Sequence, residues 1–429
     1  MSHGERHPTG LGSPSTGGGA TYARPVLGRV DGLTLRAQCL LVGLVALAAR
    51  LAYWLLATPD RLLTTDAAQY DFLAKNLAAG RGFVDTFPQL TLHATAYRPP
   101  GYPALLGLVY EVFWPTPGIG RLLNVVLGTA VAVAVAALIR PRLGPRAAVV
   151  GGLAAALSPN LVANDAYVLT EALSLLLIVG LMAAVLDRRW LLAALATGAL
   201  ILTRASGQYL VIVLAVWLFV VVGWRRALGY AAVTALVVAP WLIRNDARLG
   251  SPVLVTSNGF NFAALYSPPA DEAGHFIDPT KHPYFDDRRL EQFDEVAWDR
   301  NLRELAVDNI KDHPAVVAEV VRVNILAYFE IQPSRNELAE QADGRSLALR
   351  TATLWTFYLL LGGGVLGLWR RRREALCLLA ALIGLYFTAA SLLFVAPPRL
   401  RAPLELALCI GLAALAAPRT AGASLRREP

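Results

Sequence analysis

Two carboxylates carry the strongest chemical signal in this chain of 429 residues. Asp66 opens the motif DAAQYDFLAKNLAAGRGF, and Glu171 lies in VLTEAL at the edge of an apolar run. A carboxylate that faces an acceptor hydroxyl can take its proton, so this pair predicts acid–base chemistry. Each acid also has a structural interpretation, as a first-turn residue that the helix dipole favours.

Arginines near these acids predict a site for a phosphate group. Arginine holds phosphate oxygens with a planar fork of N–H donors. Arg98 stands directly before the sequence PPGYP, whose prolines fix the backbone, although it could also snorkel to lipid headgroups. The other candidate substrate-binding residues are Tyr70, Arg204, Arg244, Asn245, Arg399 and Arg401. Together they suggest a site for an anionic lipid headgroup.

No metal centre and no cofactor are predicted, and a divalent metal ion is left open. Cys39, Cys377 and Cys409 lie in apolar runs, which excludes a disulfide framework and a zinc–cysteine cluster. His93 and His275 cannot be paired as metal ligands from the sequence alone. The formal net charge of +8 would suggest nucleic acid in a soluble protein, but in a membrane protein it more often reflects topology. We therefore expect no nucleic-acid partner.

The composition indicates a polytopic membrane protein. The chain is 55% hydrophobic and 16% charged, with a mean hydropathy of +0.48. Soluble domains carry about 25% charged residues, so a soluble enzyme of this size is excluded as the default. A helix needs about 20 apolar residues to cross a hydrocarbon core of ~30 Å.

Ten apolar runs are expected to cross the bilayer, which predicts an all-α bundle. They are 35–57, 121–139, 147–163, 166–186, 190–203, 207–222, 227–243, 351–369, 375–395 and 403–418. The run 102–114 is also apolar, but it is short and carries Glu111, so we expect it in the interface. The segments 285–310 and 315–331 are expected to be helices lying against the membrane surface.

The placement of arginine orients the bundle. With the N-terminal tail inside, arginines concentrate in the inner loops, and the short outer loops hold only Arg204, Arg399 and Arg401. The expected organisation is a disordered cytoplasmic tail at 1–32, an N-terminal transmembrane core at 33–243 with a first outer loop at 58–120, an extracytoplasmic loop region at 244–350, C-terminal transmembrane helices at 351–418 and a cytoplasmic tail at 419–429.

A short helix just outside the first span must position Asp66. Residues of that segment recur at spacings of three and four, which puts them on one helix face. They are Asp66, Tyr70, Leu73 and Leu77. Thr64 or Thr65 can cap the helix, and Gly80 and Gly82 can end it.

Several motifs, taken in order, resemble those of a known family. They are DAAQYDFLAKNLAAGRGF, YRPPGYPALLGL, VLTEAL, PWLIRNDARLGSPV, HPAVVAEVVRVNILAYF and PRLRAPLELAL. The chain is similar over about residues 35–418 to the GT-C membrane glycosyltransferases, in particular the bacterial protein O-mannosyltransferase-like and lipid A aminoarabinose transferase-like group (glycosyltransferase family 39-like). The resemblance implies a GT-C-like bundle in the plasma (inner) membrane.

The resemblance also implies roles for single residues. Asp66 matches the family's proposed general base, Glu171 the second acid, and Arg98 the basic residue that meets the lipid phosphate. Arg244, Arg399 and Arg401 match the family's other outer cations more loosely. Ala67 stands where many relatives carry another acid.

The expected activity is transfer of a monosaccharide from a polyprenyl-phosphate donor to an extracytoplasmic acceptor. The acceptor would be a cell-envelope glycan, lipid or protein, and a single base opposite the leaving phosphate would invert the sugar. The alternative is a transporter or flippase of a lipid-linked sugar. A transporter would need polar residues at mid-depth in several helices, whereas here polarity gathers at one face.

Overall fold

The computed structural model describes residues 32–58, 63, 65–88, 91–282, 284–285 and 294–418, and this part of the chain is almost entirely helical. Its strands are β1 (Val84–Asp85) and β2 (His93–Ala94), which pair antiparallel in the first outer loop. The predicted all-α class is therefore confirmed. Nearly all of the predicted tail 1–32, the tail 419–429 and the predicted cap Thr64 lie outside the described residues.

Long apolar helices make the chain a multi-pass membrane protein. Within the described residues, six helices are long and apolar enough to cross a membrane. They are α2 (Leu35–Ala52) with the π-helical turn Tyr53–Ala57, α5 (Pro117–Leu143), α10 (Leu210–Val222) with the turn Ala205–Gly207, α11 (Trp224–Leu249), α17 (Leu347–Arg370) and α18 (Ala375–Leu393).

A bent pair of helices is a seventh candidate span. α6 (Pro145–Leu157) and α7 (Pro159–Asp165) meet at Ser158 at an angle of 57°. Pro159 explains the bend, because it has no N–H to continue the helical ladder and its ring crowds the carbonyl four residues earlier.

Three predicted spans are shorter helices. α8 (Glu171–Leu186), α9 (Trp190–Thr203) and α19 (Ala402–Ala416) have 16, 14 and 15 residues. About 20 residues are needed to cross a full hydrocarbon core. Every predicted span overlaps a helix or a helix pair, although the span predicted at 166–186 is helical only from Glu171. The count of ten crossings stays a prediction.

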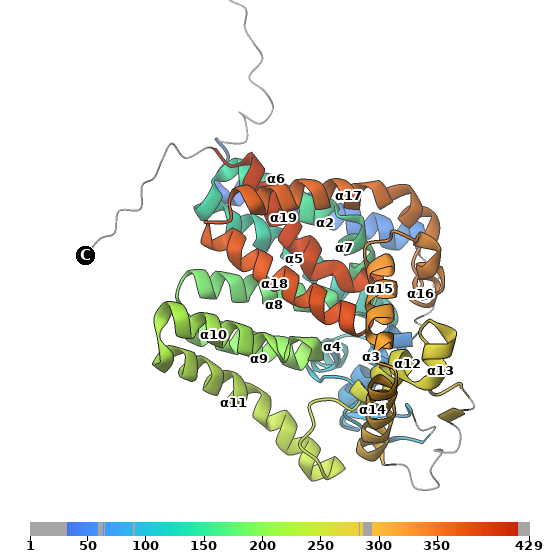
Figure 1. Cartoon of the computed structure of the whole chain (residues 1–429). Coiled ribbons are helices and arrows are strands. Elements are labelled where there is room, and N and C mark those ends of the chain that lie inside the picture. The colour runs from blue at the N-terminus through green and yellow to red at the C-terminus, as the bar shows by residue number, and fades with distance from the viewer. Residues whose placement is uncertain are drawn as a thin grey trace, which may run out of the picture.

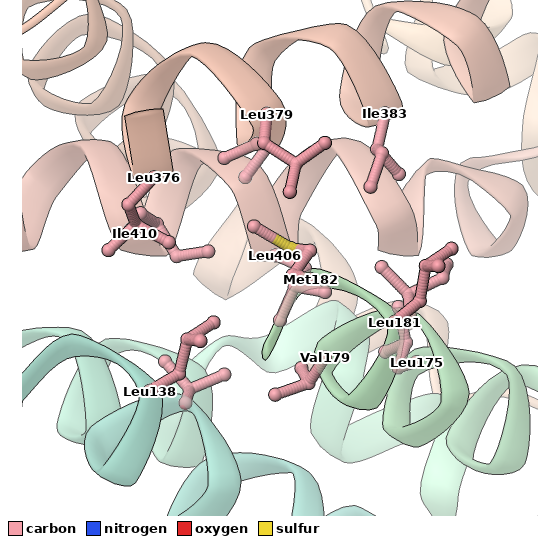
Figure 2. Close-up of a cluster of buried hydrophobic side chains, with 14 of the residues drawn as sticks. Leu138, Leu175, Val179, Leu181, Met182, Leu376, Leu379, Ile383, Leu406 and Ile410 are labelled. Carbon is pink, nitrogen blue, oxygen red and sulfur yellow. The ribbon is translucent and has the colours of Figure 1, made fainter. Parts of the chain in front are cut away.

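The core of the bundle lies between α2, α5, α6, α8, α18 and α19, where buried aliphatic side chains interlock. Figure 2 shows Leu138 of α5, Met182 of α8 and Ile410 of α19 in this cluster. Small residues allow close approach of backbones in a membrane bundle. A Cβ on Gly367 of α17 would overlap the carbonyl of Gly411 in α19, so these two helices touch through glycine.

Helices of the two predicted outer loops gather at one end of the bundle (Figure 1). They are α3 (Thr65–Ala78), α4 (Gly101–Val112), α12 (Asn258–Tyr266), α13 (Pro268–Ala273), α14 (Glu295–Asp312), α15 (Ala315–Tyr328) and α16 (Glu337–Ala342). Residues 58–120 and 244–350 therefore build one common structure. Within it, Tyr97 of the first loop packs against Phe285, Trp298 and Leu302 of the second.

α4 agrees with the expected placement of 102–114 outside the span list. Its 12 residues extend about 18 Å along the axis, too short to cross the bilayer. Tyr102, Leu106 and Tyr110 of α4 are buried, and the helix packs against α3.

The expected helix at 285–310 is wrong in its start. α14 begins only at Glu295, after Asp294, whose carboxylate accepts hydrogen bonds from the backbone N–H groups of Val296 and Ala297. This side-chain cap fixes the first turn. Residues 286–293 lie outside the described residues. The second expected helix, 315–331, is α15 and ends three residues early at Tyr328.

Candidate active site

α3 presents Asp66 at the end of the bundle where the outer loops gather. Asp66 is the second residue of the helix, and Tyr70 and Leu73, one and two turns further along, are buried. This packing fixes the helix, while the Asp66 side chain keeps 21% of its surface exposed. The helix ends where Gly80 adopts a positive φ of 70°, as the sequence predicts.

Asp66 is held between two arginines that come from distant parts of the chain. Its Oδ1 accepts a hydrogen bond from Nη2 of Arg98, and its Oδ2 accepts one from Nη2 of Arg399. Arg98 belongs to the first outer loop, and Arg399 to the turn between α18 and α19. The structure thus brings together three residues that the sequence proposed separately.

These contacts determine the protonation state of Asp66. Burial acts to raise the pKa of the Asp66 carboxyl, but the guanidinium groups of Arg98 and Arg399 outweigh it and hold that pKa well below its usual range. Asp66 is therefore ionised at neutral pH, with both oxygens engaged by arginine.

Arg98 is oriented toward the site by its own neighbours. Its Nε donates to Oε1 of Gln69 at 2.6 Å, and its guanidinium lies 5.4 Å and 5.1 Å from the ring centres of Tyr70 and Tyr97. Cation–π contacts of this kind stabilise a guanidinium by about 0.5–2 kcal/mol. The side chain is only 20% exposed, so it points into the protein and does not snorkel to headgroups.

Arg399 links Asp66 to a further carboxylate, Asp343. The Nε of Arg399 lies 3.2 Å from Oδ2 of Asp343, in the segment that joins α16 to α17. Burial raises the pKa of Asp343 to about 6, against the opposing effect of Arg399. The sequence did not point to Asp343, because a lone acid in a long polar loop has no motif or periodicity.

Glu171 and Arg204 form a loose buried pair next to this cluster. Oε1 of Glu171 lies 3.8 Å from Nη1 of Arg204, too far for a hydrogen bond. Oε2 of Glu171 and Nη1 of Arg204 are buried without a hydrogen-bond partner among the described residues. The charge of Glu171 acts on Tyr70 and on Arg399. The second predicted acid therefore lies within electrostatic reach of Arg399, one of the two arginines that bind Asp66.

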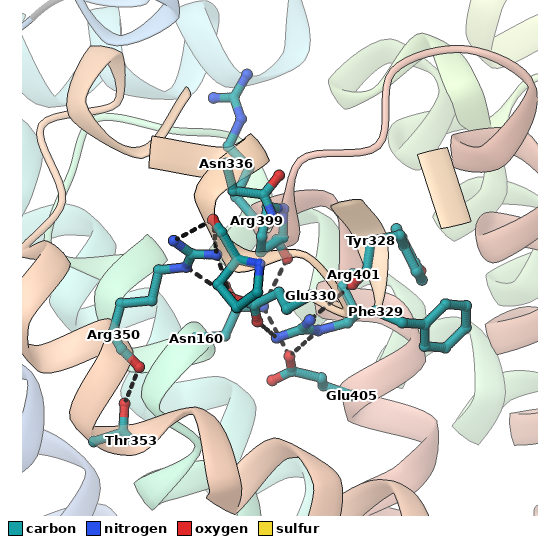
Figure 3. A network of polar contacts seen from close by, with 12 residues as sticks. Asn160, Tyr328, Phe329, Glu330, Asn336, Arg350, Thr353, Arg399, Arg401 and Glu405 are labelled. Carbon is teal, nitrogen blue, oxygen red and sulfur yellow. Dashed lines mark hydrogen bonds and ion pairs between the residues drawn. The ribbon is translucent and has the colours of Figure 1, made fainter. Parts of the chain in front are cut away.

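Arg401 lies apart from the Asp66 cluster, although it is only two residues from Arg399. It is 2% exposed, and its guanidinium pairs with Glu330 at 2.9 Å and with Glu405 at 2.7 Å. A third N–H donates to the carbonyl of Tyr328 at 2.8 Å. Figure 3 shows this network around Glu330, Arg401 and Glu405.

Arg244 and Asn245 also lie apart from Asp66. Arg244 donates to the backbone carbonyls of Phe83 and Thr95 at 2.8 and 2.7 Å, and so ties α11 to the first outer loop. Asn245 is fully buried and donates to the carbonyl of Val253. Both residues hold the loops in place, and substrate binding by them stays a prediction.

A cavity of about 990 Å³ opens between α2, α6, α7, α17 and α19. Its wall is mostly apolar, with Leu56, Leu157 and Leu360 among the lining residues. The charged lining residues are linked by ion pairs; they are Glu330, Glu340, Arg345, Arg350, Arg401 and Glu405. Pro398 also lines the cavity, and the residue that follows it, Arg399, pairs with Asp66.

The histidines do not assemble a metal site in the described part of the chain. No group of three or more His, Cys, Asp or Glu side chains there is arranged to hold an ion. His93 contacts Glu295 at 3.1 Å, and His275 contacts the carbonyl of Ala273.

Solved structures with a similar helix arrangement include two proteins with lipid phosphates. One is the archaeal oligosaccharyltransferase AglB from Archaeoglobus fulgidus in complex with an inhibitory peptide and a dolichol-phosphate, at 15% identity and a TM-score of 0.49 over 89% of this chain. The other is ArnT from Cupriavidus metallidurans bound to undecaprenyl phosphate, at 17% identity and a TM-score of 0.41 over 87% of this chain.

This chain spans 50% of the AglB chain and 76% of the ArnT chain. No family model matches it, and no curated protein matches it in sequence. The likenesses are ones of helix arrangement alone. The chemistry has to be derived from this chain's own residues.

Proposed function

We propose that this chain is a GT-C-type membrane glycosyltransferase that moves a monosaccharide from a polyprenyl-phosphate donor to an extracytoplasmic acceptor. The observation that carries the proposal is the clamp of Arg98 and Arg399 around Asp66, at the loop end of a membrane bundle. A base and two phosphate-gripping cations are the groups that such a transfer requires.

In the proposed reaction, Asp66 takes the proton from the acceptor hydroxyl as its oxygen attacks the anomeric carbon of the sugar. The bond between that carbon and the phosphate oxygen breaks, and the phosphate leaves with the electron pair. Arg98 and Arg399 stabilise the charge that builds on the phosphate. A direct attack opposite the leaving group inverts the anomeric carbon, and Glu171 orients the acceptor.

The apolar cavity is the proposed place for the first isoprene units of the donor. Pockets of 300–1,000 Å³ with apolar walls suit ligands of this kind. The cavity is about 990 Å³ and reaches Pro398, beside Arg399. A chain bound there would present its phosphate to the arginines.

We further propose that the site faces the extracytoplasmic side of the plasma membrane and serves a cell-envelope glycan, lipid or protein. The support is the bias of arginine toward the other loops. A cysteine at Lys281, whose side chain is 81% exposed, should react with an impermeant thiol reagent in intact cells. A cysteine at the exposed Arg372 should react only after permeabilisation. The reverse pattern would overturn the orientation.

Activity is tested with purified protein and a radiolabelled polyprenyl-phosphate sugar. Asp66→Asn should lower the transfer rate by about 10²–10⁴-fold, as expected for loss of a general base. Asp308→Asn is the matched control, because Asp308 is an exposed carboxylate of α14 paired only with Lys311 in the described structure. A transporter would release no free polyprenyl phosphate, and equal rates for the Asp66 variant and the control would remove Asp66 from the mechanism.

A further inference from the structure

A carboxylate stands where the proposed reaction needs a phosphate. The proposed function assigns Arg98 and Arg399 to the donor phosphate, yet each of them donates to one oxygen of Asp66. We infer that the two guanidinium groups form a phosphate site that Asp66 fills in the free protein, and that the incoming phosphate releases Asp66 for catalysis. The inference rests on the proposed function and adds how the base is activated.

Asp66 is a poor base while it is held in this way. Both oxygens accept charge-assisted hydrogen bonds, and the guanidinium groups hold its pKa well below the usual range. A base with so low a pKa abstracts a proton slowly. Without the arginine contacts, burial would act alone and raise the pKa of Asp66. Asp66 therefore accepts a proton readily only when another anion binds the two arginines.

Arg98 keeps its position without Asp66. Its Nε bond to Gln69 and its contacts with Tyr70 and Tyr97 remain when the carboxylate leaves. Gln69 is itself fixed, because its Nε2 donates to Asp85 at 2.7 Å. The guanidinium is thus pre-organised for an oxyanion.

Arg399 has a second anchor of a different kind, an ion pair in place of a side-chain hydrogen bond. A carboxylate oxygen of Asp343 lies 3.2 Å from the Nε of Arg399. The backbone carbonyl of Arg399 accepts a hydrogen bond from the Asn164 side chain at 3.2 Å. Asp66, by contrast, has no further hydrogen bond among the described residues, and its side chain turns about two bonds only. Displacement therefore moves the carboxylate and leaves both arginines in place.

A phosphate diester is a well-matched competitor for this carboxylate. Each carries one negative charge and offers two oxygens to N–H donors. The cluster of Asp66, Asp343, Arg98 and Arg399 already pairs two formal negative with two formal positive charges. An added anion would leave the cluster with excess negative charge, so exchange for the Asp66 carboxylate is favoured over simple addition.

The test is phosphate affinity in a variant that lacks the competing charge. Full-length protein in nanodiscs is titrated with undecaprenyl phosphate, the monoester that the proposed transfer releases, which offers the same phosphate oxygens and at least one negative charge. It is titrated separately with undecaprenol, which has the same chain and no phosphate. Asp66→Asn should bind undecaprenyl phosphate about ten-fold more tightly than the wild type and bind undecaprenol unchanged. Asp308→Asn should match the wild type with both lipids.

The binding measurement tests the phosphate site, and the transfer measurement tests Asp66 as the base. Equal or weaker binding of undecaprenyl phosphate by Asp66→Asn would overturn the inference, as would an equal gain with undecaprenol. Tighter binding with normal sugar transfer would keep the phosphate site that Asp66 fills, but it would remove Asp66 as the base and overturn its activation by phosphate. Asp66→Ala gives a second measurement if the amide variant does not fold, and it should show the same gain.

Discussion

Arg399 and Arg401 lie two residues apart in the turn Pro398–Arg401, yet their surroundings differ in kind. Arg401 is 2% exposed, and its guanidinium donates to Glu405 and to the carbonyl of Tyr328, forms an ion pair with Glu330 and lies 3.5 Å from the ring centre of Phe357. Arg399 is 14% exposed, and its buried Nε makes no hydrogen bond among the described residues. Its partner Asp66 is also partly exposed.

This difference distinguishes residues that hold the fold in place from residues that can bind a ligand. A buried charge is tolerated when every donor and acceptor around it is satisfied, and such a network fixes geometry. A cluster with spare hydrogen-bonding capacity and access to solvent can exchange one partner for a ligand. By this criterion Arg401 and Glu405 hold the cavity wall, whereas Asp66, Arg98 and Arg399 form the proposed reactive centre.

The largest expected effect is on folding, at Arg401. Arg401→Ala leaves Glu405 buried without its cation and Glu330 with Arg350 alone, which costs about 3–5 kcal/mol. We expect little folded protein on size-exclusion chromatography. Arg399→Ala is the matched control and should fold, because its surroundings are partly open. If Arg401→Ala unfolds at the wild-type temperature, the distinction between the two arginines is lost.

The next effect is on donor affinity, at Arg98. Arg98→Ala removes a charge-assisted contact to phosphate worth about 1.5–3 kcal/mol, which weakens binding of a polyprenyl phosphate by about ten- to hundred-fold. Thermal stability should change little. Arg81→Ala, in the same loop, removes an exposed arginine that donates to Asn76 and should leave affinity unchanged. Unchanged donor binding by Arg98→Ala would exclude its phosphate role.

A smaller effect is expected at Glu171. Glu171→Gln removes the charge of a loose pair with Arg204 but keeps the side-chain shape. Because the proposed role is orientation of the acceptor, we expect a loss of about ten-fold in kcat and an unchanged KM for the donor, milder than the loss for Asp66→Asn. A loss as large as that of Asp66→Asn would make Glu171 the base instead.

Much of the fold could be predicted from apolar periodicity alone. Every predicted span overlaps a helix or a helix pair, and Asp66 lies on a short helix outside the first span, because a 3.6-residue repeat is a local property. The number of times the chain crosses the membrane was less predictable, because α8, α9 and α19 are short and the pair of α6 and α7 bends at a proline. The length of an apolar run does not fix how a helix lies in the bilayer.

The site was only partly predictable because pairing is a tertiary property. The sequence marked Asp66 by helical spacing and Arg98 by the prolines after it as candidates, but it gave Arg399 and Arg401 the same standing. Arg399 pairs with Asp66, 333 residues earlier in the chain, whereas Arg401 pairs with Glu405, four residues later. These different partners distinguish the two arginines. Asp343 is near Arg399 only through the folding of the second outer loop, so no local pattern marked it.

The smallest expected effect concerns Glu295, an acid with satisfied hydrogen bonds that does not contact the Asp66, Arg98 or Arg399 side chains among the described residues. Glu295 accepts hydrogen bonds from the backbone of Ala96 and from Thr256, and its other oxygen lies 3.1 Å from Nε2 of His93. Burial acts to lower the pKa of His93, but the hydrogen bond to Glu295 helps to hold that pKa above its ordinary value. A raised histidine pKa contributes stability that is fully present below about pH 6.5, the unfolded value, and lost as pH rises through the folded pKa.

The wild type should therefore melt at a higher temperature at pH 6 than His93→Gln does, and the gap should narrow by pH 8.5. Because the pair is partly exposed, the contribution is below about 1 kcal/mol, on the order of 1 °C in Tm for a chain of this length. His275→Gln, at an exposed histidine, is the control. Donor affinity should stay unchanged, because Glu295 belongs to the scaffold. A gap that is the same at both pH values would refute the His93 contribution, and weaker donor binding in His93→Gln would refute the separation of scaffold from site.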